Sequence, residues 1–422
     1  MIIHQPELLK RDGHTIVHAR IELEQHPANF PDQLWYRVPE QFSQLLSLQS
    51  DAFLIPGLLA GMFFEEDIEV RGPVSPRLAY NLKEYQHLLH FRFPKVVSPV
   101  NIKYALLKSL PDKPGGVGTT FSGGVDSLFT LWKHLPQNQS NPGYQITHGI
   151  FIQGFDILPS EDQNFRFLYE KFNRAAAEIG IKLIPLETNS VSIIHQRLSI
   201  PYFYGSIIIG AGLSLAAGFG KFIIPSSWDY KQLQKKAYTS DPLLDPFLST
   251  DTLDVIHYGS THQRVEKVEK IADWEVAQKV LWVCEFHKFE KDTWNCSRCE
   301  KCARTMIPIY ALGKMDKFNT FEKPFKTNWD VLWWARKYSA DRVFTSELFP
   351  FVKEHKPDWL PWLRAGAALG TLRWLAIRLT PGLIKKWLRR YGYFVNRNEA
   401  PDAYENPEIS QHIRESYDHP ST

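Results

Sequence analysis

Residues 116–135 read GVGTTFSGGVDSLFTLWKHL and decide the fold, because a short apolar run there turns into a helical pattern. A Gly-Gly pair, Gly123 and Gly124, stands at the turn between the two. Glycine adopts backbone angles that are closed to other residues, so successive N–H groups in such a turn can face one concavity. In open parallel sheets, ligands bind beyond the carboxyl ends of the strands, where a loop enters the next helix. The segment therefore predicts a strand, a ligand-binding loop and a helix.

Three polar side chains around the glycines indicate what the loop binds. Ser122 and Ser127 supply hydroxyl donors, and the helix expected to begin near Asp126 presents the positive end of its dipole. Backbone N–H groups, hydroxyls and a helix N-terminus together favour a phosphate. The alternative is a tight turn in which Asp126 serves only as a helix N-cap.

The pattern S-G-G-x-D-S at 122–127 distinguishes this loop from other phosphate-binding loops. No lysine follows the second glycine, so the loop is not the common triphosphate P-loop, and G-x-G-x-x-G is absent. The pattern resembles the signature of the ATP pyrophosphatase (PP-loop) superfamily. That resemblance implies an adenine-nucleotide α-hydrolase-like fold and cleavage of ATP between its α and β phosphates, with adenylation of a carboxylate or amide-like oxygen.

The resemblance also implies roles for individual residues of the loop. Ser122, Gly123, Gly124 and Ser127 would hold the leaving pyrophosphate, and Asp126 would lie near a Mg²⁺ ion. Catalysis would then be electrostatic stabilisation of a phosphoryl-type transfer.

Apolar strand-like runs alternate with helical patterns from residue 119 to about 313. The runs at 118–121, 146–153, 181–187 and 221–227 precede or separate expected helices at 126–134, 164–179 and 204–217. The series continues with a run at 252–259, a helix at 263–272 and a run at 279–285. Such alternation is typical of an α/β fold with a doubly wound parallel sheet.

Composition shifts define the expected domains. Residues 1–112 alternate strand-like runs (14–23, 33–39, 66–72, 97–106) with helical patterns at 40–63 and 75–89, which predicts a small N-terminal α+β domain. We expect the PP-loop domain over 113–318, a helical basic extension over 319–400, and a loose tail over 401–422.

All four cysteines lie within 284–302, in the spacing C-x11-C-x2-C-x2-C. A disulfide framework would be spread along the chain, so this clustering indicates a metal in a reducing compartment. Four thiolates, from Cys284, Cys296, Cys299 and Cys302, can close a tetrahedral Zn²⁺ site, which is structural because no position is left for water. The alternatives are a cubane iron–sulfur cluster and buried free thiols.

The loop and the cysteine segment in this order resemble the 7-cyano-7-deazaguanine synthase (QueC-like) branch of the superfamily, over residues 116–313. The resemblance implies ATP-dependent activation of a carboxylate on a 7-deazaguanine-type substrate, transfer to ammonia or an amine, and a structural zinc. Asp229 and Tyr230 weakly match an Asp-Tyr element of that family, and Arg264, a candidate catalytic residue, lies near where the family carries a lysine. The family's arginine after the last cysteine does not align cleanly with Arg304.

The flanking regions depart from a stand-alone synthase, since about 110 residues precede the loop and about 110 follow the cysteines. Long relatives of this branch occur in bacterial anti-phage gene clusters, where a deazaguanine-like group is joined to a partner protein. A protein partner is therefore an expected acyl acceptor. Two other functions remain open: an RNA-modifying PP-loop thiolase with an iron–sulfur cluster, and a non-catalytic nucleotide-binding subunit.

Charge and hydropathy narrow the location and the partners. The net charge of +3 is too small to indicate a nucleic-acid partner, and the first thirty residues lack a secretory signal, which predicts a cytoplasmic protein. The uncharged stretch 198–220 is long enough to span a bilayer, but its proline and glycines favour a buried helix. Residues 364–397 carry eight basic and no acidic side chains. This fits a solvated helical face, a membrane-surface contact through 363–397, or a contact with a nucleic-acid backbone.

The histidines near strand ends and inside the cysteine segment add no candidate base. Each of them, at 148, 257, 262 and 287, is expected to be a hydrogen-bonded filler.

Overall fold

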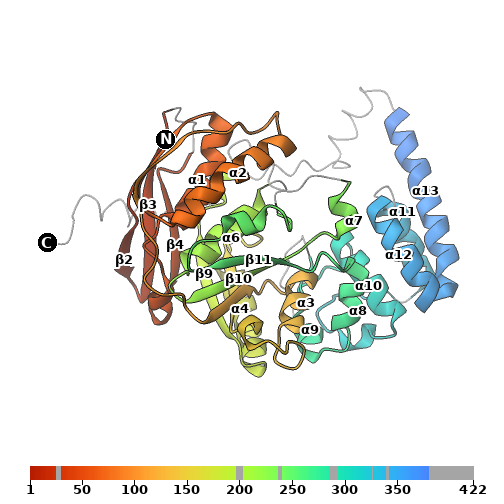
Figure 1. Ribbon diagram of the computed structural model, residues 1–422. Helices are drawn as coiled ribbons and strands as arrows, with labels where there is room; N and C mark the ends of the chain where they lie inside the picture. The colour runs from red at the N-terminus through yellow and green to blue at the C-terminus, as the bar shows by residue number, and fades with distance from the viewer. Residues whose placement is uncertain are drawn as a thin grey trace. The chain divides into compact units, whose positions relative to one another are not determined.

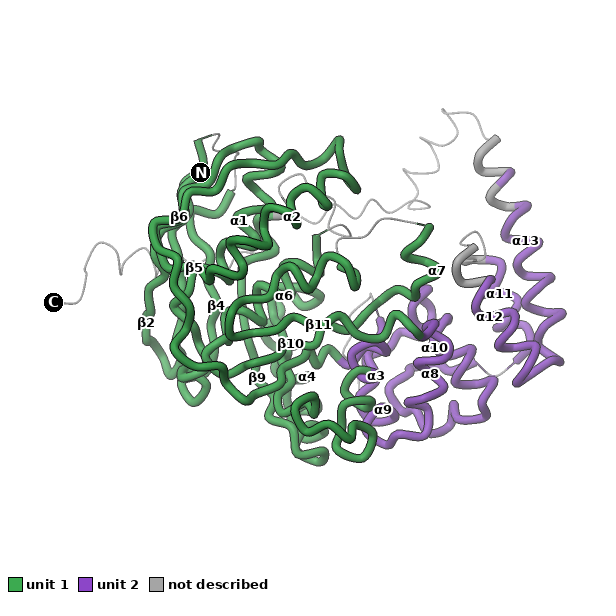
Figure 2. The backbone as a smooth tube through the Cα atoms, in the orientation of Figure 1, with its two compact units in different colours: residues 1–122, 130–261, 401–422 green, residues 123–129, 262–400 purple. Residues whose placement is uncertain are grey.

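The computed structural model describes most of the chain in two compact units. Figure 2 shows residues 1–122 and 130–261 as the first unit, and residues 123–129 with the described part of 262–400 as the second. The described residues are 1–24, 30–195, 203–235, 240–284, 293–325, 327–338 and 342–379. The domain boundaries expected near 112 and 318 stay predictions.

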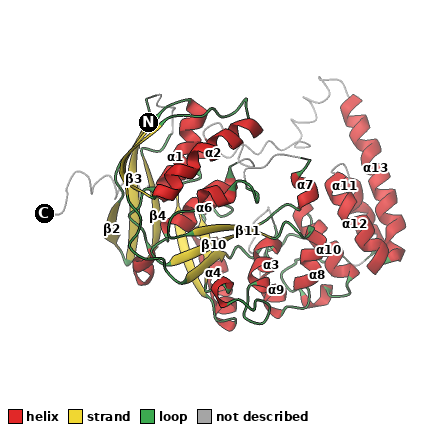
Figure 3. Ribbon diagram, in the orientation of Figure 1, coloured by secondary structure: helices red, strands yellow, loops and turns green. Residues whose placement is uncertain are grey.

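The first unit is built on one mixed sheet of eleven strands (Figure 3). The strand order is β11-β10-β7-β8-β9-β4-β3-β1-β5-β6, with β2 paired to β3. The strands are β1 (Ile2–Ile3), β2 (Glu7–Arg11), β3 (His14–Glu22), β4 (Gln33–Pro39), β5 (Ile68–Val74), β6 (Ile102–Leu107), β7 (Gly116–Thr120), β8 (His148–Gln153), β9 (Lys182–Thr188), β10 (Phe219–Pro225) and β11 (Asp254–Tyr258). The α/β class is confirmed, and the sheet extends beyond the predicted parallel part.

The five strands from β11 to β9 are parallel to one another. Their registers pair Thr119 with Ile223 and Pro225 with Tyr258, so the carboxyl ends of β7, β10 and β11 lie along one edge of the sheet. That edge is where ligands bind in open α/β sheets.

The N-terminal segment joins this sheet through antiparallel pairing. Tyr36 and Arg37 of β4 pair with Thr188 and Glu187 of β9, and Arg37 Nε lies 3.0 Å from Glu187 Oε2. Sequence periodicity predicted the N-terminal strands but not this pairing, because the partner is about 150 residues away.

Helices cover both faces of the sheet. Figure 1 shows α1 (Asp51–Phe64), α2 (Pro76–Arg92) and α6 (Tyr204–Ser214) together on one face, and α4 (Asp162–Glu178) on the other. Phe151 of β8 stacks on Phe165 of α4 at 4.7 Å between ring centroids and meets Phe172 edge-on at 5.0 Å. The helices predicted at 75–89, 164–179 and 204–217 are confirmed, within a few residues at each end.

The helix predicted over 40–63 is wrong as one element. A short 3-10 helix, η1 (Glu40–Leu45), is followed by an extended stretch before α1 begins at Asp51. Ser47 N–H donates to Ser214 O at 2.9 Å, and Ser50 N–H donates to Pro73 O at 2.7 Å. These bonds to distant residues replace the helical bonds that the local pattern would have made.

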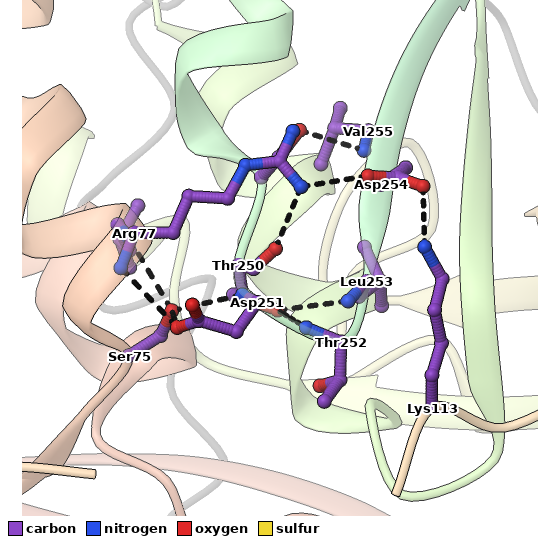
Figure 4. Close-up of polar contacts among 11 residues, drawn as sticks. Ser75, Arg77, Lys113, Thr250, Asp251, Thr252, Leu253, Asp254 and Val255 are labelled. Atoms are coloured by element: carbon purple, nitrogen blue, oxygen red, sulfur yellow. Dashed lines mark hydrogen bonds and ion pairs between the residues drawn. The ribbon is translucent and has the colours of Figure 1, made fainter. Parts of the chain in front are cut away.

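A polar network fixes the start of α2 and residue 113 to the loop before β11 (Figure 4). Asp254 accepts from Arg77 Nη1 at 2.7 Å and from Lys113 Nζ at 2.6 Å. Asp251 accepts from the Ser75 hydroxyl at 2.6 Å and from the Arg77 backbone N–H at 3.2 Å. Residues more than 140 positions apart in the sequence are held together by these bonds.

The second unit is helical. It holds the first residues of α3 (Val125–Lys133), followed by α8 (Arg264–Ile271), α9 (Glu275–Val280), α10 (Glu300–Ala311), α11 (Asn328–Tyr338), α12 (Arg342–His355) and α13 (Leu360–Leu379). Helices α8, α10 and α12 pack on one another, as do α11 and α13 (Figure 1). The ring of Tyr310 stacks on Trp359 with centroids 4.4 Å apart. The helices predicted at 126–134 and 263–272 are confirmed.

The strand predicted over 279–285 is wrong in its described part. Residues 275–280 are helical and 281–284 form no strand. Side chains of Trp294 and Asn295 make hydrogen bonds to the backbone there instead. Asn295 Oδ1 accepts from Val283 N–H, and Leu281 O accepts from Trp294 Nε1 and Asn295 Nδ2.

The two apolar or basic stretches singled out in the sequence are partly described. The stretch 198–220 contains the buried helix α6 and runs into β10, whereas 198–202 lie outside the described residues. Among the described residues, no helix combines the length and hydropathy needed to cross a bilayer. Helix α13 covers the start of the basic region 363–397, and 380–397 and the tail 401–422 lie outside the description.

Candidate functional site

The loop between β7 and α3 has the backbone that its glycines predicted. Gly123 has φ of +72°, a left-handed conformation that favours glycine. Its carbonyl accepts a hydrogen bond from Trp282 N–H at 2.8 Å, and the Gly124 carbonyl accepts the helical bond from Leu128 N–H at 2.9 Å. The loop thus follows the carboxyl end of β7 and leads directly into the first turn of α3.

Two cations hold the carboxylate of Asp126 in that first turn. Lys267 Nζ lies 2.8 Å from Asp126 Oδ1, and Arg264 Nη1 lies 3.1 Å from Oδ2. Burial raises the pKa of Asp126, but the charges of Lys267 and Arg264 outweigh it and hold that pKa below its ordinary value. Asp126 is therefore an ionised carboxylate with a cation on each oxygen.

Helix α10 brings a third cation to the group. Arg304 Nη1 lies 3.7 Å from Glu300 Oε1 on the same helix, and its charge also lowers the pKa of Asp126. Burial, together with repulsion from Arg264, lowers the pKa of Arg304 to about 10. An anion bound here would relieve that repulsion.

Arg264 has donor capacity left over. Its Nη2 reaches Thr305 Oγ1 at 3.5 Å, and its Nε is buried without a hydrogen-bond partner within the described ranges. Buried donors are nearly always satisfied in native proteins, by protein, water or ligand. A cationic group with an unused buried donor is suited to an anionic ligand.

The predicted site residues fall into two groups. The structure brings Asp126 and Arg264 into contact and places Ser127 in the same turn of α3, with Ser122 just after β7. Asp229 instead caps α7 (Tyr230–Leu233): its Oδ1 accepts from Gln232 N–H at 2.9 Å. Tyr230 is exposed.

Sequence reasoning missed Lys267. It lies one turn after Arg264 on α8, and its side chain is only 2% exposed. A lysine among the apolar positions 265, 268 and 271 of an amphipathic helix was the available signal, because a buried lysine needs a charge partner.

The four cysteines form one compact cluster. The Sγ atoms of Cys284, Cys296, Cys299 and Cys302 all lie within 4.8 Å of one another. Three of the four residues are buried, and Cys296 is half-buried. In a tetrahedral zinc tetrathiolate the sulfurs are ~3.8 Å apart, given Zn–S bonds of about 2.3 Å. The donor set and its spacing therefore fit a single ion.

Backbone N–H groups point at the sulfurs. Cys296 N–H donates to Cys284 Sγ at 3.4 Å, Cys299 N–H to Cys296 Sγ at 3.4 Å, and Cys302 N–H to Cys299 Sγ at 3.4 Å. Ser297, at φ of +58°, makes the tight turn between Cys296 and Cys299, the first C-x2-C pair. These donors stabilise thiolate charge, as expected around a metal.

Without a bound cation, hydrogen bonds among the four sulfurs shift the pKa values of the thiols in opposite directions. Bonds from the other three sulfurs lower the pKa of Cys296, and bonds to its neighbours raise the pKa of Cys302. Four adjacent thiolates repel one another, so full deprotonation needs a positive ion in the centre.

Comparison of the chain with protein-family models, curated proteins and solved structures gives no match.

Proposed function

We propose that this protein is an ATP-dependent ligase or synthase that cleaves ATP between the α and β phosphates, adenylates a carboxylate, and passes it to ammonia or an amine. The observation that carries the proposal is the cationic group of Arg264, Lys267 and Arg304 at the first turn of α3, next to the left-handed Gly123. A helix N-terminus, a backbone turn and buried cations are suited to a pyrophosphate leaving group.

The sheet topology supports the same proposal. From β7 the chain adds β8 and β9 on one side of the sheet and then β10 and β11 on the other, as in doubly wound folds. The S-G-G-x-D-S loop leaves β7 at this change of side. Ligands of open α/β sheets bind at such a switch point.

Each charged side chain has a defined part in the proposed reaction. Arg264 and Arg304 would stabilise the charge that develops on the β phosphate as the α–β bond breaks. Lys267 would hold Asp126 ionised and fixed. Mg²⁺ would neutralise phosphate charge, and Asp126 is the carboxylate of the loop that could contact it, provided it exchanges one of its two cation partners.

Zinc is the proposed occupant of the cysteine cluster. Sulfurs within 4.8 Å of one another suit a single tetrahedral ion, whereas a cubane cluster places several metal atoms between its cysteines. Four thiolate ligands leave no open position, so the ion would fix the start of α10, where Cys299 is the N-cap, and thereby Arg304.

The substrate class is proposed from the motif resemblance. It favours a carboxylate on a 7-deazaguanine-type heterocycle, and the long flanking regions favour a partner protein as acyl acceptor in anti-phage defence. Purified protein with ATP, Mg²⁺, an ammonium salt and candidate deazapurine acids should release AMP and pyrophosphate in equal amounts. Release of ADP, or no turnover with any of these acids, would contradict the proposal.

A further inference from the structure

A second polar cluster lies in the first unit, at the ends of β10 and β11. It is made by side chains that adenylation does not use: Asp245 from η4 (Asp245–Leu248), His257 near the end of β11, and Ser260 just beyond it. The positive φ of Gly259, +107°, lets the chain turn so that Ser260 folds back toward His257.

The three side chains form a continuous hydrogen-bonded chain. His257 Nδ1 lies 2.6 Å from Asp245 Oδ2, and His257 Nε2 lies 3.1 Å from Ser260 Oγ. Both distances are within the range of a nucleophile, its base and the group that orients the base. The other carboxylate oxygen, Asp245 Oδ1, is buried without a hydrogen-bond partner among the residues described.

Neighbouring bonds restrict where the protons lie. Ser240 donates to Asp245 Oδ2 at 2.9 Å, which holds the carboxylate toward His257. With the Nδ1 proton directed at that carboxylate, Nε2 is left as an acceptor, and the Ser260 hydroxyl is the donor in reach. The Ser226 hydroxyl, just after β10, lies 2.7 Å from Trp228 O and 2.9 Å from Ser260 Oγ, and it can donate its one proton to either oxygen.

The cluster lies just beneath the surface at the carboxyl edge of the sheet. Ser260 is 3% exposed, but Thr261 beside it and Ser227 beside Ser226 are exposed. Strand β10, which ends at Pro225 just before Ser226, is the direct neighbour of β7, so this edge also carries the loop that starts at Ser122. A buried Ser-His-Asp chain at this edge has the nucleophile, the base and the orienting carboxylate of an acyl-transfer site.

We propose that Asp245, His257 and Ser260 form an acyl-transfer centre with Ser260 as nucleophile, acting on small activated acyl groups such as esters or thioesters. Ser260 Oγ forms a bond to the acyl carbon while its proton passes to His257 Nε2. The bond from that carbon to the leaving group breaks, and the leaving group takes the proton. Water or an amine then attacks the acyl-serine, gives its proton to His257, and releases Ser260, which recovers the proton.

This activity needs no ATP, so it can be tested independently of the proposed adenylation. The test treats the full-length protein, without nucleotide, with a fluorophosphonate probe and maps the adduct by peptide mass spectrometry. We expect a single adduct on Ser260. His257→Gln should slow its formation at least tenfold, and Ser227→Ala, at the exposed serine beside the cluster, should change it less than threefold.

Two cysteine variants test the same proposal without the fluorophosphonate probe. Ser260→Cys should react with iodoacetamide at pH 7 at least tenfold faster than Ser226→Cys, because only residue 260 faces the imidazole. Absence of an adduct on Ser260, equal labelling of His257→Gln and wild type, or equal alkylation of the two cysteine variants would each overturn the proposal. Such results would leave the three residues as a structural network.

Discussion

Lys267 Nζ lies 2.8 Å from Asp126 Oδ1, although the two residues are 141 positions apart. Asp126 stands in the first turn of α3 and Lys267 in the middle of α8, so this contact fixes the helix that follows the loop to the helix that carries Arg264. The ion pair is thus a structural condition for the geometry of the candidate site.

Lys267→Met is expected to destabilise the protein by about 2 kcal/mol, because it removes a hydrogen bond between charged groups from a buried carboxylate. Asp126 would keep Arg264, but its pKa would rise without the charge of Lys267. Thermal and urea unfolding at pH 7 measure the change. Lys270→Met is the matched control, because Lys270 lies on the same helix and is exposed. Equal stability of the two variants would show that the contact does not matter.

Gly123→Ala is expected to separate backbone strain from ligand binding. An alanine at φ near +72° costs ~1–2 kcal/mol. Gly180 has the same φ of +72° and no atom within 4 Å of an added Cβ, so Gly180→Ala carries the strain alone. We expect both variants to lower Tm to a similar extent, and only Gly123→Ala to reduce AMP and pyrophosphate formation, by more than tenfold. Equal activity of the two variants would remove the loop from the proposed site.

The sequence predicted the parts of the molecule that depend on local pattern. The turn at Gly123, the helix after it and the four-cysteine cluster follow from residue type and spacing, and the structure has them where expected. Arg264 was selected through a family resemblance, and the structure places it on Asp126.

The remaining features depend on contacts between distant segments. The pairing of Tyr36 with Thr188 and the interruption of the helix before Asp51 are set by tertiary hydrogen bonds that no local window contains. The same holds for the partners of His257, for which the sequence predicted hydrogen bonding but not the residues that supply it. Its contacts to Asp245 and Ser260 depend on where η4 and the turn at Gly259 bring the chain.

Asp51 is expected to make stability fall as pH rises toward neutrality. Burial raises the pKa of Asp51 to about 7, against a backbone bond from Ser75 N–H that lowers it. Between its unfolded pKa near 4 and pH 7, the folded state binds the extra proton, so stabilisation present below pH 4 is lost as pH rises to about 7. The full effect is roughly 4 kcal/mol.

Asp51→Asn removes that ionisation and keeps an acceptor for Ser75. We expect its Tm to exceed that of the wild type at pH 8, with a difference that shrinks as the pH is lowered to 5. Asp254→Asn should behave oppositely: burial raises the pKa of Asp254, but its hydrogen bonds to Lys113 and Arg77 bring that pKa below the ordinary value. Losing that carboxylate should lower Tm at pH 7, and a pH-independent Tm difference for Asp51→Asn would contradict the assignment.

The cysteine cluster makes the metal directly countable, because the chain has no other cysteines. We expect one zinc per chain by elemental analysis, no iron, and no thiol reaction with a disulfide reagent in the native protein. Chelator with denaturant should then expose four reactive thiols per chain. Structural zinc sites supply about 10–16 kcal/mol of binding free energy, so chelation alone, or Cys302→Ser, should lower Tm markedly. Bound iron with visible absorbance would identify a cluster instead, and four thiols that react at once in the native protein would show that no metal is held.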